Sequence, residues 1–349
     1  MNQIPANILS LTTEAALLVE KNRISYANPA ATELLGPDCL NKHLSDVFGA
    51  EFAGVQASSF IGDVPIKGKH YIVRVSKMNF GQIIFFSPSD TAPVYLNDAM
   101  VFAANNTLNN LILSIETAYR QMPELGKSIL APLTRNCYSL TRIVSNANIV
   151  KSLSENNLVY ELKQTDLSLL FGNIIDTVCK LYPCKNFSVD LGENICAPAD
   201  ATLVSKLFLN LISNCLTHTD DSHSVSIHLS EAGETVLLSV SDNGPGIPAA
   251  ELHCVFDRYR HNFNPLQMAK GSGLGLSVVR GVAELHGGTL LMESRPDVGT
   301  CVRVSFSKKD LGKVCIHAPQ SAYEGKMRNV LTELADCLSP DCFSEVFFD

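Results

Sequence analysis

Several features that would assign this chain to a common class are missing from its 349 residues. There is no long run of lysine or arginine, and the formal net charge is -8, which argues against nucleic acid or an anionic membrane as a direct partner. No stretch approaches about 18 consecutive apolar residues, and the N-terminal MNQIPANILS lacks the basic and then apolar order of a signal peptide. We therefore expect a cytoplasmic protein without membrane insertion.

The 11 cysteines are scattered rather than paired. They form neither a C-x-x-C motif nor the cysteine and histidine spacing of a zinc site, so reduced and mostly buried thiols are expected. Cys39 and His43 lie four residues apart near a predicted turn, where core or surface roles are favoured over a haem or flavin site. Tryptophan is also absent, which excludes nothing.

What is present indicates folded structure throughout. Hydrophobic residues make up 46% of the chain and charged residues 18%, which is typical of globular proteins. The length suits two or three domains. We expect an α+β multidomain protein divided at residues 1–90, 91–160, 161–310 and 311–349.

The first segment, residues 1–90, combines short strands with a small helix. Two apolar runs flank a turn at Lys21 and Asn22, and an amphipathic helix through Leu34 and Leu35 stops at Gly36. KHYIVRVSKM and FGQIIFFS then read as strands. The segment resembles a PAS sensor domain, in which an opening hairpin is followed by an Asn-Pro-Ala step into a helix, as in residues 28–30. The resemblance implies a PAS-like α/β fold.

The second segment, residues 91–160, reads as two helices joined by the turn MPELGKS. An apolar stripe on the second helix indicates a helical hairpin, and it consists of Leu133, Leu140, Ile143, Val144, Ala147 and Val150. Because two helices alone bury little surface, we expect a homodimer that completes a four-helix bundle.

The first of these helices contains FAANNTLNNLILSI, residues 102–115, with four asparagines within six residues. Asparagine is a poor helix former because its amide competes for backbone hydrogen bonds. The flanks nevertheless predict a helix, since apolar residues recur at spacings of three and four and neither proline nor glycine occurs between Asp98 and Gln121. A solvated helix face is one explanation.

The third segment, residues 161–310, interleaves helices with alternating strands and predicts an α/β sandwich. In the tail, residues 311–349, a helix carries Met327, Val330, Leu331, Leu334 and Leu338 at helical spacing. We expect that helix to pack on its own domain, and a partner is the less favoured alternative.

Four motifs of the third segment occur in a fixed order. NLISN puts Asn210 and Asn214 on one helix face, and amide oxygens suit Mg²⁺, which takes most of its shell from water and phosphate. SDNGPGIP follows a strand and places a carboxylate, Asp242, beside a glycine loop. VFDRYR follows, and then KGSGLGLSVVRG, whose glycines open directly into a helix. Such a helix start favours phosphate.

Together the four motifs resemble the ATP-binding domain of bacterial sensor histidine kinases, whose fold is shared with gyrase, certain chaperones and mismatch-repair ATPases. The resemblance spans residues 197–306 and implies that Asp242 binds adenine and that the glycines wrap the phosphates, with a mobile lid at residues 258–270. It implies ATP and magnesium as cofactors. The candidate nucleotide-binding residues are Asn214, Asp242, Gly244, Gly246, Phe256, Lys270, Gly271, Gly273, Leu274 and Gly275, and the candidate magnesium ligands are Asn210 and Asn214.

The chain departs from that family in three places. Thr217 stands where a basic residue is usual, and His218 beside it is either a substitute or a surface histidine. Hydrolysing relatives have a glutamate general base at the position of Asn210, which argues against a stand-alone ATPase. No histidine occurs between His70 and His218, so the hairpin has no phosphoacceptor, and Asn105 or Asn106 takes its position.

Two functions stay open from the sequence. The first is a homodimeric, ATP-binding sensor of the histidine-kinase type without its own acceptor histidine, which either phosphorylates a partner or signals by conformation. The second is a degenerate regulator that binds nucleotide and forms heterodimers with a genuine kinase. A response regulator or a partner kinase is expected in either case, and the catalytic residues are not assigned.

Overall fold

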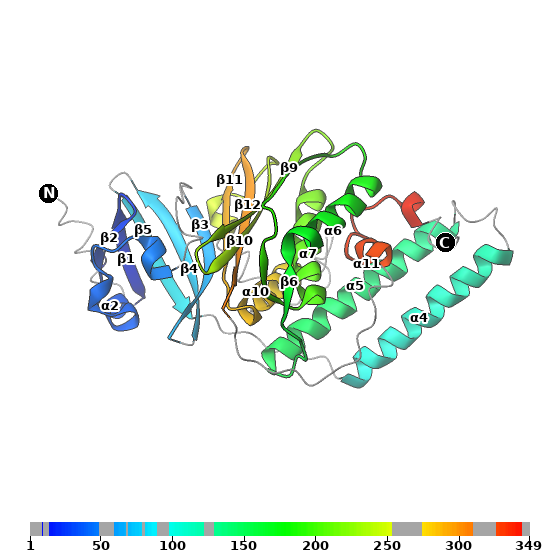
Figure 1. The fold of residues 1–349 in the computed structure, drawn as a ribbon, viewed down its shortest axis with the longest axis horizontal. Coiled ribbons are helices and arrows are strands. Elements are labelled where there is room, and N and C mark those ends of the chain that lie inside the picture. The colour runs from blue at the N-terminus through cyan, green and yellow to red at the C-terminus, as the bar shows by residue number, and fades with distance from the viewer. Residues whose placement is uncertain are drawn as a thin grey trace.

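The computed structural model describes Leu9 and residues 14–48, 59–67, 69–78, 81–88, 98–121, 129–252, 274–309 and 326–343. In these ranges the chain forms one long mixed sheet, helices packed on part of it, and a helical hairpin beyond them (Figure 1). None of the helices in the described ranges is long and apolar enough to cross a membrane.

The main sheet has ten strands in the order β2-β1-β5-β4-β3-β11-β12-β10-β9-β7. All its pairings are antiparallel except that of β7 with β9. The strands are β1 (Ala15–Glu20), β2 (Arg23–Ala27), β3 (Ser59–Ile66), β4 (Lys69–Met78), β5 (Gly81–Pro88), β7 (Asn186–Leu191), β9 (Ser224–Ala232), β10 (Thr235–Asp242), β11 (Leu290–Arg295) and β12 (Gly299–Ser307).

The N-terminal strands enclose a small core of their own. Lys21 and Asn22 turn β1 into β2 with positive φ angles of 50° and 63°. The predicted helix is α2 (Pro29–Leu35), and it ends at Gly36. Asn28 caps this helix and is fully buried. Its buried Oδ1 is satisfied, because it accepts from the N–H groups of both Ala16 and Ala31. The short helices η1 (Pro37–Cys39) and α3 (Leu44–Phe48) follow, and Cys39 lies in this core.

The N-terminal and C-terminal strands meet edge to edge. β3 pairs with β11, from Phe60 opposite Glu293 to Asp63 opposite Leu290. Leu291 of β11 is fully buried in the N-terminal core. The sequence placed these strands in two separate sheets, and periodicity within each strand carries no information about which edges pair.

The hairpin consists of α4 (Asp98–Gln121) and α5 (Ala131–Ser154), and α5 is preceded by a π turn at residues 129–130. Ile112, Ile115 and Tyr119 of α4 pack against Leu130 and Cys137. In the asparagine-rich stretch, Leu108 is buried, whereas Asn106, Asn109 and Asn110 are exposed. The first helix therefore buries Leu108, Ile112 and Ile115 and leaves those three amides in solvent.

Helices α6 (Leu167–Leu181), α7 (Ala201–His218) and α10 (Gly275–Leu285) cover one face of the C-terminal strands (Figure 1). The predicted alternation is present in β9, where Val225, Ile227 and Leu229 are buried between more exposed neighbours. A two-stranded sheet of β6 (Lys163–Asp166) and β8 (Cys196–Ala199) and the short helix α8 (Ala249–Leu252) complete the unit. The predicted α/β sandwich is confirmed here.

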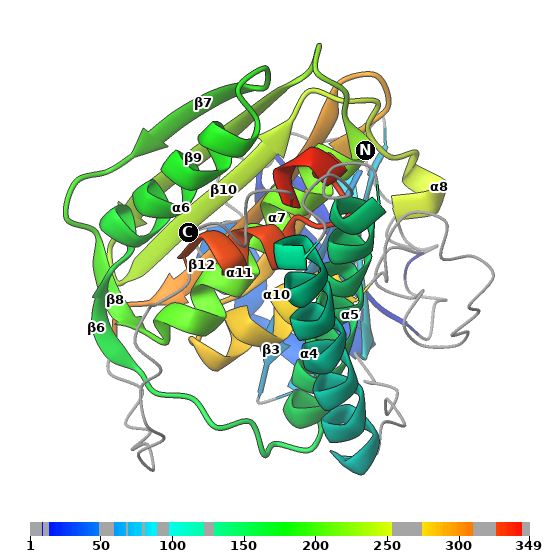
Figure 2. The ribbon, with the colours of Figure 1, turned by 90° about the vertical axis from the view of Figure 1, so that its right-hand side faces the viewer.

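The tail contributes α11 (Lys326–Glu333) and the 3-10 helix η6 (Pro340–Phe343). Figure 2 shows α11 beside α5 and α7, with α4 on the outer side of α5. The tail helix packs on its own chain, as expected. Its apolar residues Val330, Leu331, Leu334 and Leu338 are buried in the C-terminal core, and only Met327 of the predicted stripe is exposed.

Candidate functional site

The two asparagines of the NLISN motif lie on α7 in different surroundings. The Asp200 carboxylate caps this helix by accepting from the N–H groups of Thr202 and Leu203. Asn210 is fully buried, whereas Asn214, one turn further on, is partly exposed. Residues four apart on a helix are neighbours on its surface. The pair therefore stands at the border between a buried face and a solvent-accessible face of α7.

The side chain of Asn210 is hydrogen-bonded at both ends. Its Oδ1 accepts from Nη2 of Arg142 at 3.2 Å and from Nδ2 of Asn146 at 3.4 Å, and both donors lie on α5. Its Nδ2 donates to the carbonyl of Lys206 at 2.8 Å and to Oε2 of Glu333 at 3.3 Å. The amide thus joins α7 to the hairpin and to the tail at once.

The start of α10 lies directly against Asn210. A Cβ atom at Gly275 would stand 2.8 Å from Oδ1 of Asn210, closer than real Cβ atoms come to other atoms. No side-chain cap closes this helix start, and Leu274 before it is buried. The first N–H groups of a helix carry partial positive charge. Glycine at position 275 therefore lets a potential anion-binding helix start approach the predicted metal ligand.

Asp242 stands at the end of β10 and is held in a fixed orientation. Its Oδ1 accepts from the N–H of Gly244 at 2.9 Å. The thiol of Cys215 on α7 is also hydrogen-bonded to Asp242, and burial together with this carboxylate raises the pKa of Cys215 well above its usual range. The thiol stays protonated and donates to Asp242. The carboxylate is half-buried, so it is accessible to a ligand with an amino group.

Glycine is required at position 246 by the protein structure itself, independently of ligand access. Gly246 has a positive φ of 66°, and a Cβ there would lie 1.9 Å from the carbonyl oxygen of Arg295. The loop is thereby pressed against the β11–β12 hairpin. Side chains are excluded from this position by the protein itself, whatever the loop binds.

Several of the predicted nucleotide-binding residues lie outside the part of the chain that the structure describes. Phe256, Lys270, Gly271 and Gly273, together with the predicted lid at residues 258–270, lie outside the described residues. The structure brings Asn210, Gly275 and Leu274 together. Asp242 is linked to the same helix α7 through Cys215.

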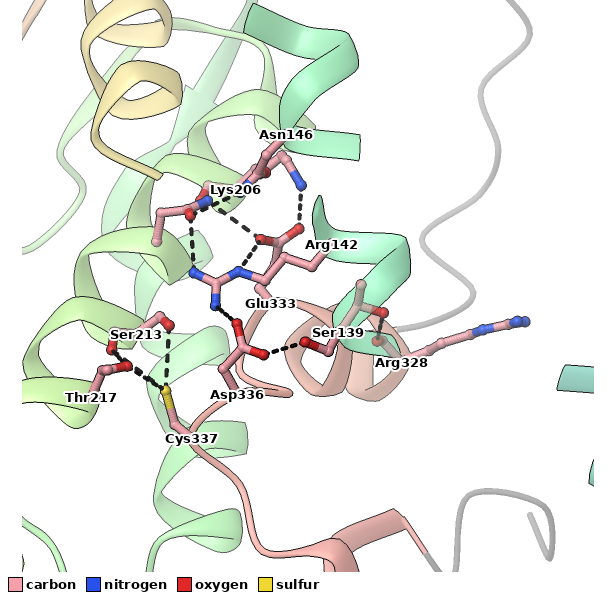
Figure 3. Close-up of polar contacts among 12 residues, drawn as sticks. Ser139, Arg142, Asn146, Lys206, Ser213, Thr217, Arg328, Glu333, Asp336 and Cys337 are labelled. Atoms are coloured by element: carbon pink, nitrogen blue, oxygen red, sulfur yellow. Dashed lines mark hydrogen bonds and ion pairs between the residues drawn. The ribbon is translucent and has the colours of Figure 1, made fainter. Parts of the chain in front are cut away.

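Thr217, at the position where the sequence resemblance implies a basic residue, contacts the tail. Its hydroxyl donates to the carbonyl of Ser213 at 2.7 Å and lies 3.1 Å from Sγ of Cys337 (Figure 3). His218 beside it is exposed. The departure at this position is thus part of a contact between α7 and the C-terminal segment.

His286 connects the far ends of α10 and α7. Its Nδ1–H donates to the carbonyl of Val282 at 2.6 Å, and its Nε2 accepts from the N–H of Asp200 at 3.0 Å. Burial lowers the pKa of this imidazole. A neutral ring satisfies both bonds, so His286 serves as a fixed strut between the two helices.

The site described above lies within a segment that is similar to known proteins. Residues 199–310 match the family described as histidine kinase-, DNA gyrase B-, and HSP90-like ATPase. The match contains α7, the end of β10 and the start of α10. This segment belongs to that ATPase family. We refer to it below as the ATPase domain.

Two similar curated proteins are described as a sensor histidine kinase and a sensor protein. The chain is 25% identical over 194 residues to the sensor histidine kinase YvrG of Bacillus subtilis, covering 55% of this chain and 33% of that protein. It is 39% identical over 114 residues to the sensor protein IrlS of Burkholderia pseudomallei, covering 31% and 24% respectively. The chain therefore spans about a third or less of these two relatives.

Among solved structures, the histidine kinase ThkA in complex with the response regulator protein TrrA shares 20% identity and has a TM-score of 0.38. The match covers 87% of this chain and 98% of that one.

Sequence patterns missed the partners of Asn210. Arg142 and Asn146 lie four residues apart on α5, and Glu333 and Asp336 lie three apart in the tail. Both spacings place side chains on one helix face. Glu333 occurs within the apolar stripe of the tail helix, and this position is the sequence signal that it is buried with the stripe.

Proposed function

We propose that the chain is an ATP-binding, magnesium-dependent sensor of the histidine-kinase type that lacks its own acceptor histidine in the hairpin. The observation that carries the proposal is the contact between Gly275 and Asn210 inside the matched ATPase domain. It brings a helix start suited to phosphate onto a helix that carries two amide ligands suited to magnesium.

Each described site residue then has a task. Asp242, fixed by Gly244 and Cys215, accepts a hydrogen bond from the adenine amino group. The start of α10 binds phosphate oxygens through its N–H groups. Asn214 and Asn210 hold magnesium, which supplies charge neutralisation for phosphoryl transfer. The partial exposure of Asn214 supports this task, whereas Asn210 has to give up both hydrogen bonds to its Oδ1 first.

Phosphoryl transfer to the hairpin's own first helix is not expected. In Asn105 and Asn106 the amide nitrogen has its electrons delocalised into the carbonyl, so it is no nucleophile. Thr107 follows Asn106, where the family has an acid that orients the acceptor. The proposed acceptor is therefore a histidine on a partner protein, such as a partner kinase.

The direct test uses purified full-length protein and γ-labelled ATP with magnesium. We expect nucleotide binding and no acid-labile label on the protein itself. Asp242→Asn should weaken binding at least about tenfold, because a charged hydrogen bond to adenine contributes about 1.5 to 3 kcal/mol. Asp190→Asn, in an exposed strand residue that contacts His228, is the matched control. Stable self-labelling on histidine would contradict the acceptor argument.

A second function, a degenerate regulator that forms heterodimers with a genuine kinase, is favoured by Thr217. A threonine bonded within the chain offers no positive charge to a phosphate. This function predicts nucleotide binding without turnover. Co-purification with candidate kinases and response regulators tests it, and failure to capture any of them would count against it.

The remaining parts of the proposal concern signal input and assembly. The opening hairpin and the Asn28-capped step into α2 support a PAS-like sensor at residues 1–90. Exposed leucines on α5, Leu133 and Leu140, support homodimerisation through residues 91–160. A cytoplasmic location and a response-regulator partner belong to the same proposal.

A further inference from the structure

The C-terminal segment, residues 326–343, fills the space between the hairpin and the ATPase domain. Its α11 contacts α5, α6 and α7, and η6 contacts α5. Its buried apolar side chains join the same core as α7, and they are Val330, Leu331, Leu334, Ala335, Leu338 and Phe343. Two residues of the segment contact α7. Glu333 bonds to Asn210, and Cys337 lies against Thr217. The segment therefore covers one face of the helix that carries the predicted magnesium ligands.

A cluster of two cations and two carboxylates is buried under this segment (Figure 3). Nη1 of Arg142 lies 3.0 Å from Oδ2 of Asp336, and Nε of Arg142 lies 3.6 Å from Oε2 of Glu333. Lys206 of α7 pairs with the other oxygen of Glu333. Arg142, Lys206 and Glu333 are each less than a tenth exposed. Charges buried to this degree require their partners, so the tail acids hold α5 and α7 together.

The same cluster determines what Asn210 can bind. Arg142 and Asn146 occupy the two acceptor positions of its Oδ1. A magnesium ion on that oxygen would have to replace these donors and would be repelled by the guanidinium group, which is positively charged at all relevant pH values. Asn210 therefore becomes a metal ligand only when α5 moves away from it.

We propose that residues 326–343 form a latch that keeps α5 on Asn210 and so holds the ATPase domain in a form with weak magnesium-nucleotide binding. The proposal rests on the function proposed above. Release of Glu333 and Asp336 frees α5, and Asn210 then joins Asn214 in holding the metal. Metal binding at Asn210 and latch closure compete, so magnesium-nucleotide binding and closure each weaken the other.

Two features of the closed cluster favour its opening. Within the described part of the chain, Nε of Arg142 and Oδ1 of Asn146 are buried without a hydrogen-bond partner. Buried polar atoms without partners cost free energy in the closed state. Arg135 fixes the segment by donating to the carbonyls of Ala335 and Asp336, which are bonds that a partner or solvent can replace.

The test compares full-length variants in binding of a fluorescent ATP analogue, with magnesium and with EDTA. Glu333→Gln removes one charge of the cluster at nearly constant shape. If the latch leaves about a tenth of the molecules open, this variant should bind the magnesium form up to about tenfold more tightly, with a smaller change in EDTA. Asp336→Asn, at a more exposed position, should change binding in the same direction and is the second variant should Glu333→Gln fail to fold. Asp341→Asn, an exposed acid of the same segment, is the matched control.

Hydrogen exchange without nucleotide gives a second readout. In Glu333→Gln, amide exchange around Arg142 and Asn146 of α5 should rise, whereas in Asp341→Asn it should not. Faster exchange with unchanged magnesium-dependent affinity would overturn the latch and leave the segment a purely structural element. Absence of nucleotide binding by every variant, with and without magnesium, would overturn the proposed ATP binding and the latch with it.

Discussion

The two helices of the hairpin are equal in length but differ in their surroundings. α4 and α5 both contain 24 residues. α4 packs on α5 through Ile112, Ile115 and Tyr119 and leaves Leu111 and Leu113 exposed. α5 contacts α4 on one side and α10, α11 and η6 on the other, and it buries Arg142 and Asn146 fully or nearly so.

The two helices of the hairpin therefore differ in the parts of the chain that they contact. α4 carries the asparagine-rich stretch, and within the described residues it packs mainly on its partner helix. α5 contacts the ATPase domain, because side chains of α5 bond to Asn210. Matched substitutions on the two helices should therefore have unequal effects.

The largest contrast is expected between two arginines. Arg142 on α5 is buried between two carboxylates, whereas the side chain of Arg120 on α4 is 72% exposed and pairs with Glu116 one turn away. Arg142→Ala should lower the free energy of unfolding by about 3 to 5 kcal/mol, because it leaves buried carboxylates uncompensated. Arg120→Ala should cost less than about 0.5 kcal/mol. Urea denaturation measures both, and equal effects would contradict the buried cluster.

A second contrast uses leucines. Leu331 of the tail is fully buried in the C-terminal core, whereas Leu113 of α4 is 61% exposed. Leu331→Ala should cost about 3 kcal/mol through loss of burial and the cavity left behind. Leu113→Ala should change stability by less than about 0.5 kcal/mol. Thermal denaturation at low protein concentration separates them, and a neutral Leu331→Ala would mean that the tail does not belong to the core.

Sequence periodicity was sufficient to predict helices and strands, but it did not predict which of them contact each other. The apolar spacing of residues 98–121 and the alternation in β9 predicted a helix and a strand that are both present. Motif order located α7, β10 and α10. The β3–β11 pairing and the contact of Glu333 with Asn210 join residues far apart in the chain. Local sequence patterns carry no information about such long-range contacts. From the sequence, Glu333 was therefore not distinguished from an ordinary exposed polar residue.

A third prediction concerns the side of the hairpin that the chain leaves open. Leu133 and Leu140 are seven residues apart on α5 and about half exposed, which is the spacing of a bundle seam. The double variant Leu133→Ser, Leu140→Ser should weaken the proposed homodimer at least about tenfold, or about 1.4 kcal/mol. Analytical ultracentrifugation over a concentration series measures this. Leu113→Ser on α4 is the control, and an unchanged dimer in the double variant would place the interface elsewhere.

The smallest effect should come from pH, and one source of it is His286 of the ATPase domain, which is fully buried. In the folded chain His286 is neutral, since burial lowers its pKa and the N–H of Asp200 donates to its Nε2. Below the ordinary histidine pKa of about 6.5, the unfolded chain takes up a proton that the folded chain does not. The free energy of unfolding should therefore decrease as pH falls from about 6.5 toward the lower folded pKa, with a slope of at most one proton, about 1.4 kcal/mol per pH unit.

Above that window the contribution of His286 is fully present. His286→Gln should remove this component of the slope, whereas His228→Gln, at an exposed position on β9 beside Asp190, should keep it. Urea denaturation at a series of pH values measures the slopes. A slope that persists in His286→Gln would assign the acid response to other groups and would contradict the role of the buried neutral His286.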